Sequence, residues 1–554
     1  MYRLVQRMNK NKISAWWKGL KMNKLKRLFT CAITLVLAFA MCVPVTAQAD
    51  ATTYTITINN SATGHTYEAY QIFTGDLTTD GNNNKVLSNI AWGNGITTAG
   101  QTALLTFNGQ TYTSAAKLAE AITTTDLAAK FAKAAAAYLQ NPTESTAGDG
   151  SYAISGLSAG YYLVKDKANT LADKDDFYTA YIMEVVGNVT ATPKGDKPTL
   201  DKFIFHNDAN AGAGEWQKVA DNQIGDTVKF KLTATTPTSI GQYDKTTYTF
   251  VIHDTLDAGF TYTADGLYAT YAAVGAGETT MDTSKYEVTE NNGAITVTFK
   301  MSELIGTELS ANGGDTLNVY YNATLNKSAK IHTDTNVNTA YLEYSNDPNG
   351  TTTGKTAEVK VYDYTYTMKV HKIDENNADL DGAVFALSKN GTLGEVAADE
   401  NGVPTDTTNF IALVATGTAN TYRVATAAEI AAADVTKVYA VPAGTAIVQG
   451  LDDATDYYFY ETKEPTGYNK LAAPVEFNIA ATFTADVTAA PTLTVAINDG
   501  NAQENLQADV QNEKGTVLPS TGGMGTTIFY IVGGVLVLGA AIALITRRRM
   551  KNNG

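Results

Sequence analysis

Alternating apolar and polar side chains recur along most of this chain, and the pattern predicts a protein built mainly of β-strands. The first clear example is residues 54–58, where Tyr and Ile alternate with Thr. Side chains two positions apart share one face of a strand, so this run would bury one face and leave the other in water. Comparable segments predict strands over 161–164, 181–189, 227–234, 247–253, 294–299, 317–325, 337–344, 364–373, 383–387, 457–462, 475–479 and 506–512.

The strand-rich segments fall into three groups. The sequence Pro-Lys-Gly-Asp-Lys-Pro at 193–198 has the composition of a linker and marks the first boundary. An Ala-rich amphipathic stretch at 115–139 predicts helices within the first group. The regular spacing of strands and turns in the second group is typical of a β-sandwich. We therefore predict an N-terminal domain at 50–193, a linker at 194–198, a middle domain at 199–361 and a C-terminal domain at 362–515.

The N-terminus has the pattern of an export signal. Nine basic residues and no acidic ones lie within the first 27 positions, and an apolar run follows at 28–45. Ala47 and Ala49 then form the small-x-small pattern that signal peptidase needs. We predict cleavage after Ala49, which makes residues 1–49 a signal peptide. Met22 opens a signal of more ordinary length, so Met1 and Met22 both stay open as the start.

The C-terminus combines a pentapeptide, an apolar span and a basic tail. The pentapeptide is Leu518, Pro519, Ser520, Thr521 and Gly522, and the apolar span at 528–545 is long enough to cross a bilayer. Three arginines and a lysine follow, which keep that end cytoplasmic. Residues 516–554 resemble the LPxTG sorting signal of Gram-positive surface proteins. The resemblance implies transient insertion of the precursor in the membrane, sortase cleavage between Thr521 and Gly522, and attachment to peptidoglycan.

Charge and cysteine content exclude several other functions. The two terminal segments hold 13 of the 41 basic residues and none of the 56 acidic ones, so the mature chain has a net charge of −28. This excess of negative charge argues against binding nucleic acid. Both cysteines, Cys31 and Cys42, lie in the signal peptide, so the mature chain has no disulfide. The five histidines lack metal-ligand spacing, and we predict no metal and no cofactor.

The lysine in the first linker has a specific counterpart in known proteins. Lys194 follows Pro193 at the end of the predicted N-terminal domain. In this arrangement the mature chain resembles a three-domain major pilin of the SpaA type, although Thr192 stands where that family has a tyrosine. The resemblance implies that Lys194 attacks a thioester formed at Thr521 of another copy. It also implies these partners: copies of the chain itself, a pilus-specific class C sortase, a housekeeping sortase, peptidoglycan and minor pilins.

A second resemblance concerns the C-terminal domain. Residues 458–468, Tyr-Phe-Tyr-Glu-Thr-Lys-Glu-Pro-Thr-Gly-Tyr, resemble the E-box of Cna B-type domains, which have an immunoglobulin-like β-sandwich fold. The resemblance implies that Glu461 assists an isopeptide bond between Lys372 and Asn512. Strand parity agrees, because each of the three shares a face with apolar neighbours. A salt bridge between Lys372 and Glu461, without the covalent bond, is the alternative.

The middle domain carries an equivalent set of residues. The resemblance implies a Lys202–Asn338 bond assisted by Asp254, which lies in the sequence His-Asp-Thr-Leu. Asn336 has the same parity as Asn338, so it stays a rival acceptor. The opening strand of the N-terminal domain has no lysine, and we predict no bond there.

These observations leave two functional classes open. One is the shaft subunit of a sortase-assembled pilus, and the other is a monomeric, tip or basal wall-anchored adhesin for a host or bacterial ligand. We find no motif for turnover of an external substrate, so we do not expect an enzyme. The isopeptide chemistry would occur once within each chain.

Overall fold

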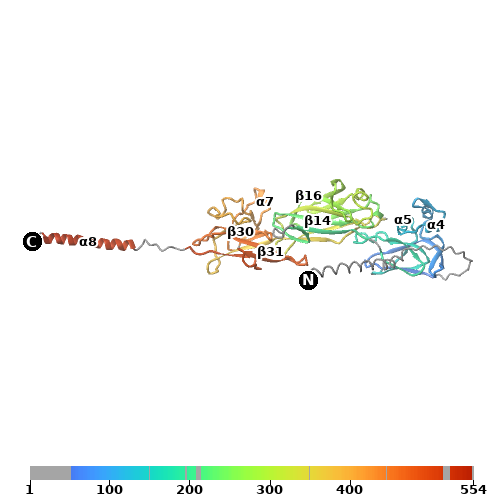
Figure 1. Ribbon diagram of the computed structural model, residues 1–554, viewed down its shortest axis with the longest axis horizontal. Helices are drawn as coiled ribbons and strands as arrows, with labels where there is room; N and C mark the ends of the chain where they lie inside the picture. Colours follow the sequence, from blue (N-terminus) through green and yellow to red (C-terminus); the bar gives the residue numbers. More distant parts are fainter. Residues whose placement is uncertain are drawn as a thin grey trace, which may run out of the picture. The chain divides into compact units, whose positions relative to one another are not determined.

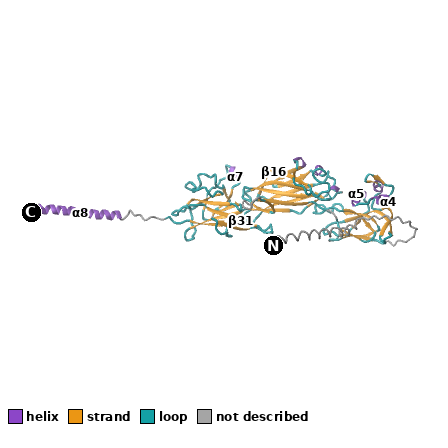
Figure 2. Cartoon of the chain, in the orientation of Figure 1, coloured by secondary structure: helices purple, strands orange, loops and turns teal. Residues whose placement is uncertain are grey.

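The computed structural model describes residues 52–551, apart from 147, 149, 194–195, 208–213, 349, 445 and 516–524. Strands make up most of the regular structure in Figure 2, and the predicted mostly-β class is confirmed. The described chain forms two compact units. Unit 1 contains the residues up to Thr365 together with Phe483–Pro491, and unit 2 contains Tyr366–Thr482 and the residues from Thr492 onward.

The predicted N-terminal and middle domains both lie within unit 1, each with its own sheets. The division of the chain into three domains therefore stays a prediction. The predicted boundary at 361/362 falls inside strand β23, Val359–Tyr364, which pairs with β21, Asn336–Ser345. Ladder hydrogen bonds thus keep residues up to 364 in a sheet of unit 1.

The N-terminal part of unit 1 contains two main sheets, ordered β10-β1-β7 and β3-β2-β8-β9, with β6 paired to β2 and a small β4–β5 pair. Its strands are β1 Tyr54–Ile58, β2 Tyr67–Thr79, β3 Lys85–Trp92, β4 Thr106–Phe107, β5 Gln110–Thr111, β6 Thr143–Glu144, β7 Tyr152–Leu157, β8 Gly160–Asp166, β9 Ala180–Val185 and β10 Val189–Ala191. Its helices are α3 Thr98–Leu104, α4 Ala115–Ala121, α5 Thr125–Ala135 and the 3-10 turn η1 Ala136–Tyr138.

Helices α4 and α5 occupy the stretch predicted to be helical (Figure 1). Both begin at an N-cap, where the Ser114 hydroxyl accepts from the Lys117 amide and the Thr124 hydroxyl accepts from the Leu127 amide. Phe131 of α5 is fully buried, so the helix contributes to the core of this part of the unit.

The single strand predicted over 181–189 is wrong. The structure has two strands there, β9 in one sheet and β10 in the other, where β10 runs parallel to β1. Between them, the side chain of Asn188 accepts a hydrogen bond from the Thr55 amide at 3.0 Å. This contact holds the chain where it passes from one sheet to the other.

The middle part of unit 1 is made of two larger sheets. Their orders are β12-β11-β14-β20-β16-β17 and β13-β23-β21-β15-β19-β18, with β22 paired to β21. The remaining strands are β11 Thr199–His206, β12 Glu215–Gln217, β13 Val219–Asp221, β14 Thr227–Thr235, β15 Phe250–Leu256, β16 Phe260–Ala272, β17 Thr279–Thr280, β18 Tyr286–Asn291, β19 Ala294–Phe299, β20 Thr316–Leu325 and β22 Thr353–Lys355. The short helices are α6 Met301–Leu304, η2 Ile240–Gln242 and η3 Thr283–Lys285. Side chains of β11 and β15 meet between the sheets, as in a sandwich.

Unit 2 also has two sheets, ordered β26-β27-β29-β24-β33 and β28-β25-β30-β31-β32. Its elements are β24 Tyr366–Ile373, β25 Val384–Ser388, β26 Leu413–Ala415, β27 Thr421–Val424, α7 Ala427–Ala431, β28 Val441–Pro442, β29 Ala446–Leu451, β30 Asp456–Lys463, β31 Val475–Thr482, β32 Thr492–Ile497, β33 Gln507–Gln511 and α8 Gly525–Lys551. The first and last strands, β24 and β33, are parallel neighbours, and Lys372 lies opposite Val510. Both residues of this pair are buried.

Candidate crosslinking sites

The middle site lies between the two sheets of the sandwich. Lys202 comes from β11 of one sheet, and Asp254 and Asn338 come from β15 and β21 of the other. Each side chain is at most 1% exposed. Alternation along each strand turns these three residues inward, as their parity predicted.

A tyrosine that the sequence analysis did not single out connects the three side chains. The Lys202 ammonium donates to Asp254 and, at 3.2 Å, to the hydroxyl of Tyr321. That hydroxyl donates to Oδ2 of Asp254 at 2.8 Å and accepts from the amide nitrogen of Asn338. Tyr321 is in phase with buried Val319 and Ala323 on β20, so parity alone could have placed it in the core.

Burial is the main influence on ionisation in the middle site. It lowers the pKa of Lys202 and raises the pKa of Asp254, while the attraction between the two groups opposes both shifts. Among the described residues, Oδ1 of Asp254 and Oδ1 of Asn338 are buried acceptors without a hydrogen-bond partner. Such unsatisfied buried atoms are costly, which is typical of a site arranged for chemistry.

Asn336, the rival acceptor, is also buried but has different partners. Its amide nitrogen donates to the carbonyl groups of Lys330 and Asp363, both at 3.2 Å. Its side-chain oxygen accepts from the Lys330 amide at 2.8 Å. The backbone therefore satisfies this side chain, whereas Asn338 contacts the tyrosine that also contacts the lysine.

The C-terminal site also joins residues from both sheets of unit 2. Lys372 lies on β24, Glu461 on β30, and Asn512 directly after β33. The amide nitrogen of Asn512 donates to Oε1 of Glu461 at 2.8 Å, and the Leu471 amide donates to Oε2 at 2.7 Å. The Lys372 ammonium donates to the carbonyl of Val510 at 2.7 Å.

Burial again sets the protonation tendencies. It lowers the pKa of Lys372 to about 8, against the attraction of Glu461. It raises the pKa of Glu461, against the hydrogen bonds from Leu471 and Asn512. Oδ1 of Asn512 is a buried acceptor without a partner among the described residues. The arrangement supplies an amine that readily loses its proton and a carboxyl group that holds the amide.

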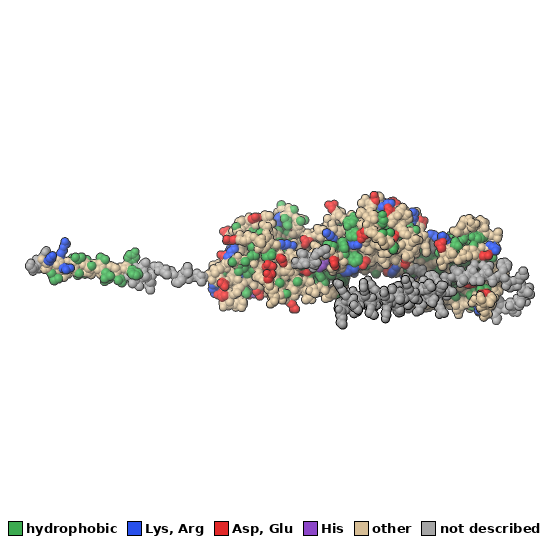
Figure 3. All heavy atoms as spheres, viewed as in Figure 1, with side chains coloured by type: hydrophobic (Ala, Val, Ile, Leu, Met, Phe, Trp, Pro, Cys, Tyr) green, Lys and Arg blue, Asp and Glu red, His purple; other side chains and the backbone are tan. Residues whose placement is uncertain are grey.

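Several predicted sites lie outside the described residues. These are Lys194, the pentapeptide at 518–522, and Ala47 and Ala49 of the predicted signal peptide. The apolar span at 528–545 lies within helix α8, whose segment Phe529–Lys551 is long and apolar enough to cross a membrane. Figure 3 shows hydrophobic side chains along this helix and basic side chains gathered near its end.

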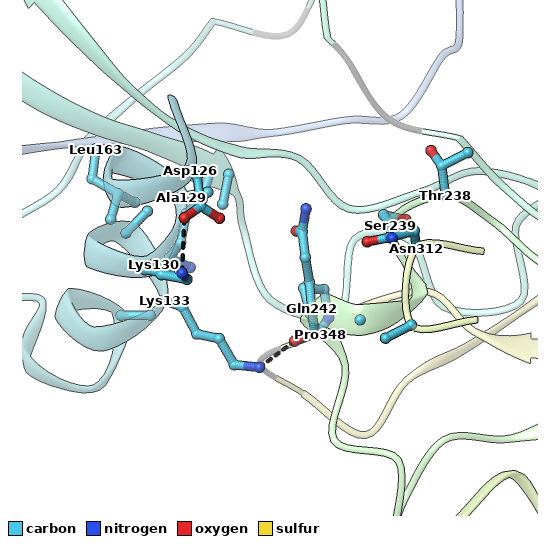
Figure 4. Close-up of a pocket in the computed structure, with 16 residues that line it drawn as sticks. Asp126, Ala129, Lys130, Lys133, Leu163, Thr238, Ser239, Gln242, Asn312 and Pro348 are labelled. Carbon is cyan, nitrogen blue, oxygen red and sulfur yellow. Dashed lines mark hydrogen bonds and ion pairs between the residues drawn. The ribbon is translucent and has the colours of Figure 1, made fainter. Parts of the chain in front are cut away.

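One pocket in unit 1 lies apart from both sites. It has a volume of 440 Å³ and is lined by α5 and by residues around Thr238 and Ser239. Figure 4 shows its two helical lysines engaged: Lys130 with Asp126, and Lys133 with the carbonyl of Gln242.

Comparisons with known proteins support the expected family. Residues 366–492 match the SpaA prealbumin-like fold domain, and residues 510–553 match the LPXTG cell wall anchor motif. The trypsin-resistant surface T6 protein of Streptococcus pyogenes serotype M6 is 26% identical over 270 residues. That match covers 42% of this chain and 48% of the T6 protein, so the chain spans about half the length of this relative.

Solved pilin structures are also similar to the chain. The T6 backbone pilin of Streptococcus pyogenes has 15% identity and a TM-score of 0.44, over 84% of this chain and 99% of that one. The major pilin SpaD of Corynebacterium diphtheriae has 15% identity and a TM-score of 0.41, over 84% and 98%.

The anchor motif and helix α8 define a protein fixed to the cell wall, whose precursor is membrane-bound. With the SpaA prealbumin-like domain, the chain is an LPXTG-anchored protein that is similar in part to the T6 surface protein.

Proposed function

We propose that this chain is the repeating shaft subunit of a covalent pilus, stabilised by two internal isopeptide bonds. The observation that carries the proposal is the pair of buried lysine, acid and asparagine sets in a chain that also has the anchor motif. A monomeric adhesin would need the anchor but not a joining lysine. The T6 relative, whose solved structure is a backbone pilin, supports the same assignment.

In the middle site, the reaction begins when Lys202 passes its proton to Asp254. The neutral amine attacks the side-chain carbon of Asn338, and the Asn338 amide nitrogen leaves as ammonia after receiving a proton. An amide bond between the two side chains remains. Tyr321 contacts all three groups, so it would orient the asparagine and stabilise the carboxyl group.

In the C-terminal site, Lys372 attacks the side-chain carbon of Asn512 in the same way. Its lowered pKa supplies the neutral amine, and the raised pKa of Glu461 favours the protonated acid that polarises the amide. Ammonia leaves, and a Lys–Asn amide bond forms. Glu461 already holds the Asn512 amide nitrogen, which is the group that must be protonated.

Both bonds would connect an early strand to a late part of the same sandwich, across two sheets for Lys202 and Asn338 and beside paired strands for Lys372 and Asn512. Lys372 and Asn512 lie on or beside the parallel first and last strands of unit 2, and Lys202 lies on the first strand of the middle sandwich. A covalent bond at that place carries a pulling force directly between the ends of the domain. This would suit a shaft subunit with no disulfides.

Polymerisation would join Lys194 of one copy to Thr521 of the next. A pilus-specific sortase cleaves after Thr521 and holds the new end as a thioester on its cysteine. The neutral amine of Lys194 attacks that thioester, an amide bond forms, and the enzyme thiol is released. A housekeeping sortase would transfer the last Thr521 to peptidoglycan instead, and minor pilins would join at the ends.

The experiment is a blot of cell-wall extracts boiled in detergent and reductant. We expect a ladder of very large species for the natural chain and monomer for Lys194→Ala. The matched control is Lys327→Ala, an exposed lysine of unit 1, which should keep the ladder. A single monomeric band from the natural chain would refute the shaft role and indicate a monomeric wall-anchored adhesin.

A further inference from the structure

Two side chains hold the backbone of Lys202 at a point where β11 no longer has β12 beside it. Within the described chain, β12 pairs with β11 only from Ile204 to His206. Before that stretch, the carboxylate of Asp201 accepts from the Lys202 amide at 2.9 Å. The ammonium of Lys218 donates to the Lys202 carbonyl at 2.5 Å and also to the Asp201 carboxylate. An ion pair therefore satisfies backbone groups of the proposed nucleophile that a neighbouring strand would otherwise satisfy.

Lys218 is the single residue between β12 and β13, where the chain passes from one sheet of the middle sandwich to the other. Its side chain holds Lys202 on β11, while its own carbonyl accepts from the Tyr362 amide on β23 at 3.0 Å. Tyr362 follows Val361, which lies opposite Asn338 on β21. Lys218 therefore contacts the backbone of the lysine on one sheet and, on the other sheet, the strand next to the asparagine.

The charge of Lys218 also affects how the middle site ionises. Among the described residues, the titratable groups that contact Lys202 are Asp201 and Lys218 at its backbone, and Asp254 and Tyr321 at its ammonium. Burial is the main cause of the lowered pKa of Lys202; the attraction of Asp254 opposes this shift, and the positive charge of Lys218 adds to it. The side chains of Lys218 and Asp201 are 33% and 49% exposed, so their ion pair contributes little to stability by itself.

We propose that Lys218 is a positioning residue for the Lys202–Asn338 bond, because it fixes the backbone that carries the amine and places a positive charge at the Lys202 carbonyl. The inference rests on the proposed function. A fixed backbone keeps the amine close to the asparagine and reduces the entropy that is lost in the attack. The positive charge disfavours a second cation nearby, so the proton of Lys202 passes more readily to Asp254 and leaves the neutral amine that attacks.

The test follows formation of the middle bond in the whole mature chain. A short pulse of cell-free synthesis is diluted into buffers of graded pH, and samples are stopped in acid at intervals. After digestion with a protease, mass spectrometry gives the fraction of Lys202 that is joined to Asn338. The rates define a profile that rises with pH as the coupled pair of Lys202 and Asp254 loses its first proton.

Lys218→Met removes the charge and the hydrogen bond but keeps an apolar side chain over the ring of Phe203, whose centroid lies 4.3 Å from the natural ammonium. We expect the rate of bond formation to fall on the order of five-fold. The rising limb of the profile should move to higher pH, because removing a nearby cation raises the pKa of both Lys202 and Asp254. Lys218→Gln keeps a donor without the charge and should show the same shift of the profile.

Two further variants test whether the charge at this position is the cause. Lys218→Arg keeps the charge and the donor, so it should restore the natural rate and profile. The matched control is Lys229→Met, which removes an exposed lysine that lies over the ring of Phe205 on the same strand, β11. Lys229 is not among the groups that contact Lys202, so this control should change neither the rate nor the profile.

The outcomes separate the inference from the function on which it rests. If the natural chain gives no joined peptide at any pH, the internal bond of the proposed function does not form, and the role of Lys218 fails with it. If the natural chain is joined but Lys218→Met has the natural rate and profile, the positioning role is overturned and the bond stands. An equal loss in Lys229→Met, or a failure of Lys218→Arg to restore the rate, would also overturn it, because the charge at position 218 would then not be the cause.

Discussion

Replacing Glu461 by glutamine should separate the chemistry of the C-terminal site from its packing. The glutamine side chain has nearly the same shape, and its carbonyl oxygen can still accept from the Leu471 amide. The glutamine side chain cannot, however, donate the proton that the Asn512 nitrogen must receive before it leaves as ammonia. We therefore expect Glu461→Gln to fold without forming the Lys372–Asn512 bond.

The size of the effect follows from the chain that the bond encloses. Residues 372 to 512 form a loop of roughly 140 residues, and the entropy model for a crosslink of that length gives about 5 kcal/mol of stabilisation. For a unit of this size, such a loss lowers the melting temperature by on the order of 15–20 °C. This is a large part of the roughly 5–15 kcal/mol that holds a typical domain folded.

The assay combines intact mass with calorimetry on the purified mature chain. The natural chain should lack one ammonia molecule for the Lys372–Asn512 bond, and Glu461→Gln should retain that ammonia. The melting transition of unit 2 should also move to lower temperature in the variant. The matched control is Glu464→Gln, an exposed acid three residues further along the same strand end. It should keep both the bond and the melting temperature.

Two results would refute this reasoning. If the natural chain has its full sequence mass, neither internal bond forms, and Lys372 stays a buried amine that donates to the Val510 carbonyl. If Glu461→Gln loses ammonia as the natural chain does, the carboxyl group is not needed to relay the proton.

The other predictions concern unit 1. Asn338→Ala should abolish the middle bond and restore one ammonia to the mass, whereas Asn336→Ala should keep the bond but cost about 1–3 kcal/mol of unfolding free energy by leaving backbone groups unpaired. Equal masses for the two variants would contradict this assignment. Tyr321→Phe should slow formation of the middle bond, seen as a fraction of uncrosslinked mass soon after synthesis; full crosslinking at the natural rate would show that the hydroxyl is dispensable. Burial lowers the pKa of His65, but Asp166 and Asp176 outweigh it and raise the pKa from 6.5 to about 9 on folding. Protonated His65 therefore adds about 3 kcal/mol to the free energy of unfolding below pH 6.5, and this stabilisation is lost as the pH rises through 9. The melting temperature of the natural chain should fall across this pH range, and that of His65→Gln should change less. Identical pH profiles for the two proteins would contradict the role of His65.

The sequence was most informative where a side chain's direction follows from its own strand. Lys202, Asp254 and Lys372 are buried because strand alternation is a local property, and each sits in phase with apolar neighbours. The helices at 115–139 were predictable for the same reason, since their apolar period and caps lie within the segment itself.

Parity could not separate Asn336 from Asn338, because both point to the same side of β21. Only their hydrogen-bond partners in the folded chain distinguish them: the backbone of Lys330 and Asp363 for Asn336, and Tyr321 for Asn338. The division of 181–189 into two strands has a similar origin, since it depends on a contact with Thr55 from the start of the chain.

The sequence by itself therefore determined the strand-rich class, the C-terminal anchor motif and the residue types of both candidate sites, because these depend on local periodicity and on short contiguous motifs. The tertiary structure alone decided which asparagine contacts Tyr321 and how that tyrosine connects the lysine and the acid of the middle site. These features depend on hydrogen bonds between residues up to 119 positions apart in the sequence, and such bonds form only when the sheets pack.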